Sequence, residues 1–123
     1  MATGLIRALA LLPALLLGTP PATSRAMEFR PFTQQGVTVL LGQGEIVPGD
    51  ARRLAAALSR HAIDGATILL DSPGGNVGES LELGAMIRER RLATAVASGA
   101  ICASACVFVL AGGAIRDVDR GAR

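Results

Sequence analysis

The sequence contains no lysine, no tryptophan and no tyrosine, and these absences exclude several kinds of site. Three phenylalanines are the only aromatic residues, so a core must be built from aliphatic side chains. All twelve basic residues are arginines, and the formal net charge is only +2. No basic patch is interleaved with aromatic residues, which is the pattern of a nucleic-acid surface. We therefore expect no nucleic-acid partner. The lack of lysine also excludes a P-loop.

Residues that bind metals or cofactors are equally scarce. The chain has one histidine, His61, and two cysteines, Cys102 and Cys106. A structural zinc ion needs four such ligands, so we expect no metal. The glycines at Gly42 and Gly44 lack the third glycine of a dinucleotide-binding fingerprint. We expect no cofactor.

The N-terminus has the order of regions found in a secretory signal peptide. An arginine precedes the apolar run Ala8–Gly18, which is too short to span a bilayer, and prolines and small residues follow. This order predicts a signal peptide over residues 1–26 with cleavage after Ala26; cleavage after Ala22 and an uncleaved anchor are the alternatives. We expect an exported protein, periplasmic or secreted, with no stable membrane span after cleavage.

The remaining chain alternates between strand and helix signals. Residues 27–36 are polar and are interpreted as a lead-in segment, and residues 37–123 are interpreted as one domain. Short apolar runs predict strands over 37–41, 66–70 and 93–97, and helical patterns cover 51–60, 77–91 and 102–110, with a further strand beginning within 114–123. Short connections between alternating elements indicate an α/β fold with a parallel sheet and right-handed crossovers. The continuous apolar strands favour burial on both faces of the sheet.

A glycine-containing loop, Pro73–Gly75, directly follows the second predicted strand. Open α/β sheets bind ligands at the carboxyl ends of their strands, where this loop must lie. The two glycines permit close approach of a ligand to the backbone, and their N–H groups could hold a phosphate or an oxyanion. A tight turn without a ligand is the alternative reading of the same residues.

Two motifs taken together resemble a known family. The segments ILLDSPGGNV and TAVASGAICASACVFVLAGG, in this order, resemble the Clp protease proteolytic subunit, within the crotonase-like superfamily, and the resemblance extends from Val37 to Gly113. It implies that Ser104 is the nucleophile and that the N–H groups of Gly75 and Ala105 form the oxyanion hole. It also implies that the protein forms a homo-oligomer and that its substrate is a peptide or protein. The substrate-binding loop would contain Ser72, Pro73, Gly74 and Asn76.

The general base that a serine nucleophile needs is missing from this pattern. In the family a histidine and an aspartate follow the serine, whereas no histidine or lysine follows Ser104 here. His61 does not match the family position, and Asp71, Asp117 and Asp119 are interpreted as loop or surface charges. We expect a C-terminally truncated, exported, peptidase-like serine hydrolase that is inactive as given. The alternatives are a non-catalytic binding or assembly module and an acyl-thioester enzyme that uses only the oxyanion hole.

The two cysteines flank Ser104 and leave two readings open. An exported protein meets oxidising conditions, and Cα atoms four residues apart on a helix are about 6 Å apart, which a disulfide can bridge. Cys102 and Cys106 therefore either form a disulfide that fixes the turn or pack as two buried thiols.

Overall fold

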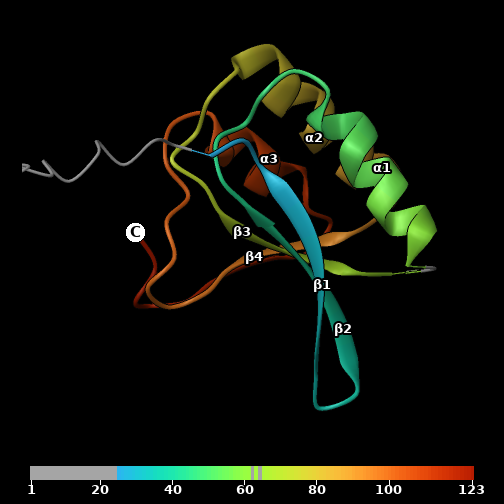
Figure 1. The fold of residues 1–123 in the computed structure, drawn as a ribbon. Helices are drawn as coiled ribbons and strands as arrows, with labels where there is room; N and C mark the ends of the chain where they lie inside the picture. The colour runs from blue at the N-terminus through green and yellow to red at the C-terminus, as the bar shows by residue number, and fades with distance from the viewer. Residues whose placement is uncertain (1–24, 62, 64) are drawn as a thin grey trace, which may run out of the picture.

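The part of the chain that the structure describes forms an α/β fold with five strands and three helices. The computed structural model describes residues 25–61, 63 and 65–123. The elements in chain order are β1 (Glu28–Gln34), β2 (Val37–Gln43), α1 (Asp50–Arg60), β3 (Thr67–Asp71), α2 (Val77–Glu89), β4 (Ala93–Val96), α3 (Cys106–Gly112) and β5 (Arg116–Val118). The strands lie in this order across one mixed sheet, in which β1 is antiparallel to β2 and all other neighbours are parallel (Figure 1). The predicted α/β class is confirmed, and the expectation of a wholly parallel sheet is corrected by β1.

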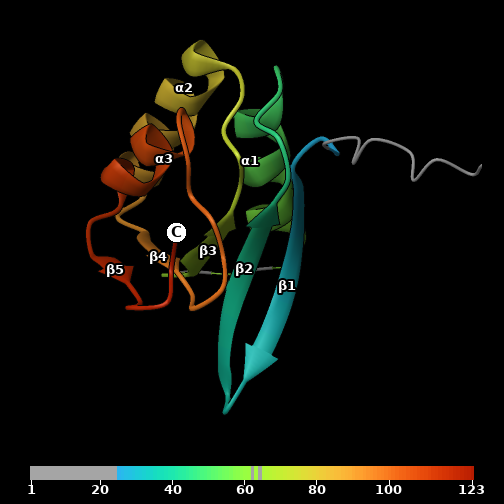
Figure 2. The ribbon, with the colours of Figure 1, turned by 90° about the vertical axis from the view of Figure 1, so that its left-hand side faces the viewer.

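The segment expected to be a polar lead-in is the first strand of the sheet. β1 pairs with the whole of β2 through a two-residue turn in which Gln35 and Gly36 have φ angles of 51° and 76°. Two successive residues with positive φ form the type of turn that matches the twist of a hairpin. Pro31 argued against a strand in the sequence, because proline has no N–H to donate to a neighbouring strand. It is tolerated on an edge strand, where no ladder hydrogen bond is needed on the outer side. The far end of this hairpin extends beyond the other strands (Figures 1 and 2).

The three helices cover one face of the sheet. Each parallel connection moves one strand further in the same direction, and right-handed crossovers then place α1, α2 and α3 on the same side (Figure 2). Beneath them lies the aliphatic core, whose members are almost fully buried: Leu40, Ile46, Leu54, Ile68, Leu70, Leu83, Ile87 and Val109. On the opposite face, side chains such as Leu41 and Leu69 are only half-buried. The expectation that the described strands are buried on both faces was therefore wrong.

The last helix begins later than the sequence pattern predicted. The apolar run favoured a helix from Cys102, whereas α3 begins at Cys106. Ser104 has a φ of 53°, a left-handed conformation that a right-handed helix cannot contain. α3 packs closely on α2, since a Cβ added to Gly84 would lie 2.6 Å from the carbonyl oxygen of Phe108. This close packing fixes the direction of α3 and hence the place of the turn before it.

Candidate functional site

Two loops meet at the carboxyl edge of the sheet. One follows β3 and contains Ser72–Asn76, and the other follows β4 and leads to Ser104. They run side by side because the Ser72 N–H donates to the Ile101 carbonyl at 2.7 Å and the Ala103 N–H donates to the Ser72 carbonyl at 3.1 Å. The structure thus brings the glycine loop and Ser104 together from distant parts of the sequence.

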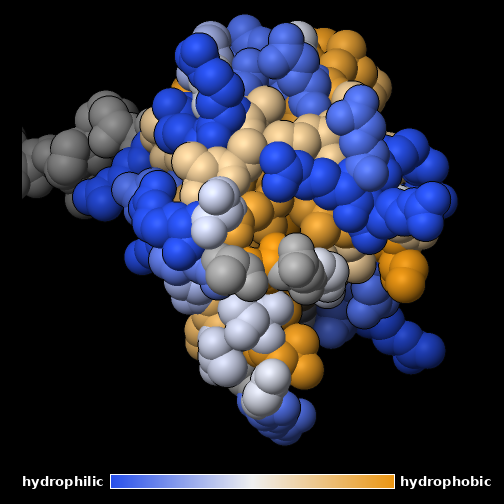
Figure 3. Space-filling view, turned by 90° about the vertical axis from the view of Figure 1, so that its right-hand side faces the viewer, coloured by the Kyte–Doolittle hydropathy of each residue, from blue (hydrophilic) through white to orange (hydrophobic). Residues whose placement is uncertain are grey.

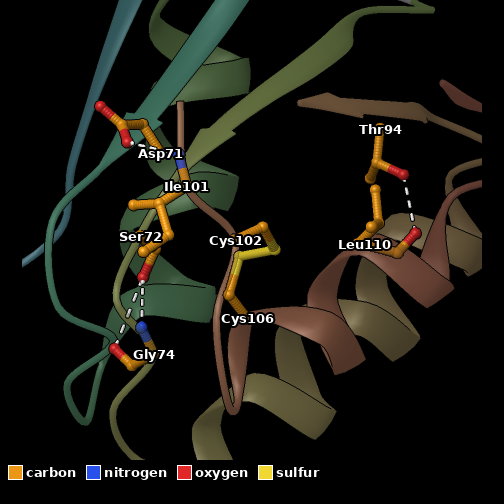
Figure 4. The surroundings of a disulfide bond; sticks show 8 residues. All are labelled: Asp71, Ser72, Gly74, Thr94, Ile101, Cys102, Cys106 and Leu110. Carbon is orange, nitrogen blue, oxygen red and sulfur yellow. Dashed lines mark hydrogen bonds between the residues drawn. A yellow bond between two sulfur atoms is a disulfide. The ribbon is translucent and has the colours of Figure 1, made fainter. Parts of the chain in front are cut away.

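Asp71 fastens these loops to the sheet. Its Oδ1 accepts a hydrogen bond from the Ile101 N–H at 3.1 Å (Figure 4). Its Oδ2 accepts one from Nε2 of Gln43 at 2.7 Å. One carboxylate therefore connects β2, the end of β3 and the segment that leads to Ser104. Asp71 was interpreted as a loop or surface charge, so this role was not predicted. No local signal could have revealed it, because both partners are distant in the sequence.

Several residues of the predicted substrate-binding loop have structural partners within the chain. Ser72 is fully buried, and its Oγ accepts a hydrogen bond from the Gly74 N–H at 3.1 Å (Figure 4). Asn76 is the N-cap of α2, where its Oδ1 accepts a hydrogen bond from the Glu79 N–H at 2.8 Å. Pro73 is exposed. Ser72 and Asn76 therefore shape the loop, and the groups that remain available to a ligand belong to its backbone.

The backbone of Gly75 has one side free. Its neighbours Gly74 and Asn76 bond to Ile46 in a parallel bridge: the Ile46 N–H donates to the Gly74 carbonyl, and the Asn76 N–H donates to the Ile46 carbonyl, each at 2.8 Å. In such a bridge the N–H and C=O of the middle residue point to the other side. Within the described residues, no hydrogen bond uses the Gly75 N–H. Gly75 is exposed, so this group faces outward.

Ser104 lies against the glycine loop. A Cβ added to Gly74 would lie 2.9 Å from the Ser104 Cβ and 3.1 Å from the Ala105 nitrogen. Only glycine leaves room for this approach, and Gly74 also has a φ of 106°. Ser104 is exposed, whereas Ala105 is buried and is the N-cap of α3. No hydrogen bond among the described residues uses the Ala105 N–H.

A disulfide spans the turn that carries Ser104. The Cα atoms of Cys102 and Cys106 are 5.2 Å apart, and their sulfur atoms are 2.07 Å apart, within bonding distance (Figure 4). The spacing of four residues would suit two cysteines on one helix. In the structure only Cys106 is helical, and Cys102 lies in the strand-like segment beside Ser72. The bond therefore links this segment to the first residue of α3.

No hydrogen bond among the described residues joins the Ser104 hydroxyl to a histidine or a carboxylate. His61 follows the last residue of α1, and this helix runs from the carboxyl edge back to the amino ends of the strands. Its eleven residues correspond to about 16 Å of helix. Asp71 is already engaged in the two hydrogen bonds described above, and Asp117 lies within β5. Residues 25–61, 63 and 65–123 also contain no cluster of three or more side chains suited to hold a metal ion.

Two clefts among the described residues are not lined by Ser104. The larger, of about 310 Å³, separates β1 from α1 and is lined by Met27, Glu28, Phe29, Arg30, Arg53, Ala56, Ala57 and Arg60. Figure 3 shows the α1 side of the molecule, where apolar residues in orange and tan are bordered by hydrophilic residues in blue. The smaller, of about 210 Å³, is polar and is lined by Gly49, Arg52, Glu79 and Glu82. Neither cleft is lined by Ser104 or Gly75, both of which are exposed.

Comparisons with known proteins assign no family to the chain. No family model, no curated protein and no solved structure matches the chain. Within the part of the chain that the structure describes, no helix combines the length and the apolar character needed to cross a membrane. The predicted signal peptide falls mostly on residues 1–24, which lie outside the described residues.

Proposed function

We propose that the carboxyl-edge site is a serine hydrolase centre of the Clp protease type, in which Ser104 is the nucleophile and the substrate is a peptide or protein. The observation that carries this proposal is the contact between the glycine loop and the turn before α3. In support of the proposal, an exposed serine adjoins the glycine loop at Gly74, and two backbone N–H groups in these segments, those of Gly75 and Ala105, have no partner among the described residues.

This arrangement suits the stabilisation of a tetrahedral intermediate. Attack of the Ser104 hydroxyl on a carbonyl carbon creates negative charge on the carbonyl oxygen, and paired N–H groups held in advance stabilise that charge. Loss of one such donor costs about 2.7–4 kcal/mol in the transition state of serine hydrolases. Asp71, Ser72 and Gly74 contribute by fixing the two loops relative to each other. The resemblance between the two motifs and the Clp protease family supports the same assignment.

The proposal includes the expectation that residues 1–123 alone do not turn over substrate. A serine hydroxyl is a weak nucleophile without an adjacent base, and the described residues place no histidine at this edge. A test must therefore detect the nucleophile and the oxyanion hole without requiring catalysis. Peptide boronic acids are suitable because boron forms a tetrahedral adduct with a serine oxygen and no leaving group has to depart.

The experiment measures binding of a peptide boronic acid by boron NMR and by intact mass. We expect saturable binding by the native chain, loss of binding in Ser104→Ala, and unchanged binding in Ser59→Ala, which removes an exposed hydroxyl from α1. Equal binding by Ser104→Ala, or no binding by the native chain at millimolar concentration, would overturn the assignment. A fluorophosphonate probe applied in parallel should label none of the three proteins.

A second candidate function is the capture of extended peptides without turnover. The specific observation in its favour is that both the N–H and the C=O of Gly75 point away from Ile46, as in the outer edge of a strand. An extended peptide could pair with that edge. Binding of an unmodified peptide that persists in Ser104→Ala, together with absence of a boronic acid adduct, would favour this module over the hydrolase.

We also propose that the protein is exported and self-associates. The N-terminal pattern supports export, and the family resemblance supports an oligomer. Expression of the chain with a C-terminal tag, followed by mass spectrometry of the exported product, should give Met27 as the first residue. Light scattering on the mature protein should give a mass that is a multiple of the monomer mass. A retained N-terminus would contradict the first expectation, and a monomer would contradict the second.

A further inference from the structure

We propose that the Cys102–Cys106 disulfide is a redox site, opened by a dithiol reductant, and that only its oxidised form holds the Ser104 turn in the observed conformation. The structural part of this inference stands without the proposed function. Its consequence for chemistry rests on the proposed function, because only a reactive Ser104 would be controlled in this way.

The disulfide closes a small ring around an unfavourable backbone conformation. The two cysteines are separated by 4 positions, and Ser104 lies midway between them with a φ of 53°. An L-amino acid with a Cβ atom avoids this region unless its surroundings enforce it. The covalent link between the flanking residues limits the other conformations that the turn could adopt.

The disulfide also joins two parts of the structure that are anchored separately. Cys102 is held at the sheet side, where its N–H donates to the Arg123 carbonyl at 2.8 Å and its segment runs beside Ser72. Cys106 is fully buried in the first turn of α3. The covalent bond therefore crosses from the sheet side to the helix side, directly over the turn that presents Ser104.

Reduction should loosen the turn without unfolding the sheet. The backbone bonds across the turn are those from the Cys106 N–H to the Ala103 carbonyl and from the Val107 N–H to the Ser104 carbonyl, each 3.1 Å long. Both lie within the ring or at its border, whereas the ladders between β2, β3 and β4 do not involve these residues. The effect of the redox state should therefore be confined to the start of α3.

The chemistry of opening follows from the unequal burial of the two cysteines. Cys102 is half-buried and Cys106 is fully buried, so a reductant thiolate attacks the sulfur of Cys102. The S–S bond breaks, Cys106 leaves as a thiolate and takes up a proton, and Cys102 carries a mixed disulfide. The second thiol of the reductant then attacks the reductant's first sulfur, which is bonded to Cys102. This step forms the cyclic disulfide of the reductant and releases Cys102 as a thiolate, which takes up a proton. The products are two protein thiols and an oxidised, cyclic reductant.

The test compares amide hydrogen exchange in the oxidised and reduced proteins. The chain is incubated with dithiothreitol in the absence of denaturant, and thiol formation is counted by maleimide labelling and mass spectrometry. We expect complete reduction under native conditions and at least a tenfold faster exchange in a peptide covering residues 103–108. A peptide covering residues 67–71 of β3 should be unchanged. The double variant Cys102→Ala with Cys106→Ala should exchange like the reduced protein at any redox potential.

Two outcomes would overturn the redox proposal. The first is equal exchange over residues 103–108 in the oxidised and reduced proteins, and the second is a bond that is reduced only in denaturant. If the double variant does not fold, native protein that has been reduced and alkylated supplies the same comparison. Binding of the peptide boronic acid is measured on both forms, and we expect it to weaken at least tenfold on reduction. Failure of both forms to bind would defeat the proposed function alone, since the exchange data still decide the redox proposal.

Discussion

Substitution of Gly75 by alanine tests whether the glycine loop and the segment after β2 are joined as the structure describes. Gly75 has a φ of 142°, and an added Cβ would meet backbone atoms of Ile46, including its carbonyl oxygen and, at 2.8 Å, its nitrogen. No side chain can rotate away to relieve this contact. The strained conformation costs about 1–3 kcal/mol, and each of the two backbone hydrogen bonds to Ile46 that is lost costs about 0.5–1.5 kcal/mol. We therefore expect Gly75→Ala to lower the free energy of unfolding by about 4 kcal/mol.

The measurement is urea denaturation followed by circular dichroism, because the chain has no tryptophan or tyrosine to serve as a fluorescence probe. At a slope of about 1.5 kcal/mol per molar urea, the midpoint should fall by roughly 2.5 M. The matched control is Gly36→Ala, which has a φ of 76° but no atom within 4 Å of the added Cβ. The control should lose only about 1–2 kcal/mol, from the backbone conformation alone. Equal losses in the two variants would refute the reasoning, since crowding by Ile46 is what separates them.

Three further substitutions test how the site is held. Asp71→Ala removes the carboxylate that accepts from the Ile101 N–H, and should lower the free energy of unfolding by about 2 kcal/mol in the same urea assay, while Asp71→Asn should lose less. Asn76→Ala removes the N-cap of α2 and should cost about 1 kcal/mol, which Asn76→Asp should restore; no loss in the alanine variant would argue against the cap. Gly112→Ala places a Cβ against the Gly84 carbonyl and should lower the melting temperature by about 10 °C or more, and a shift below about 3 °C would contradict the close helix contact.

The sequence predicts the elements whose signals are local. The runs that became β2, β3 and β4 are aliphatic or β-branched over strand length, and α1 and α2 follow the helical pattern within a few residues. β1 was not predicted because charged residues and a proline such as Pro31 are typical of a loop. Its place in the sheet depends on pairing with β2. The start of α3 was not predicted for a different reason: CASAC suits a helix, and the features that keep Ser104 out of one are tertiary, namely the contact with the glycine loop and the disulfide across the turn.

The candidate site is predictable where it follows from topology. Loops after adjacent parallel strands must meet at the carboxyl edge, so the approach of Ser104 to the glycine loop at Gly74 follows once the strand order is known. The connections made by Asp71 do not follow, because its partners lie on β2 and on the segment after β4. The burial of Ser72 inside its own loop was also not predicted, since a serine before a proline and two glycines suggests a side chain that faces a ligand.

The position of His61 narrows the ways in which Ser104 could be activated. A general base must come within about 3 Å of the proton that it removes, directly or through one water molecule. α1 separates His61 from the carboxyl edge by about 16 Å of helix, and movement of a side chain cannot cover that distance. Asp71 cannot replace it without giving up the bonds that hold the two loops together. If Ser104 is the nucleophile, neither His61 nor Asp71 supplies its base in this arrangement, and a base would have to approach from the exposed side of the Ser104 turn. If the disulfide holds that turn, as we propose, the same bond also sets the direction from which a base could reach the hydroxyl.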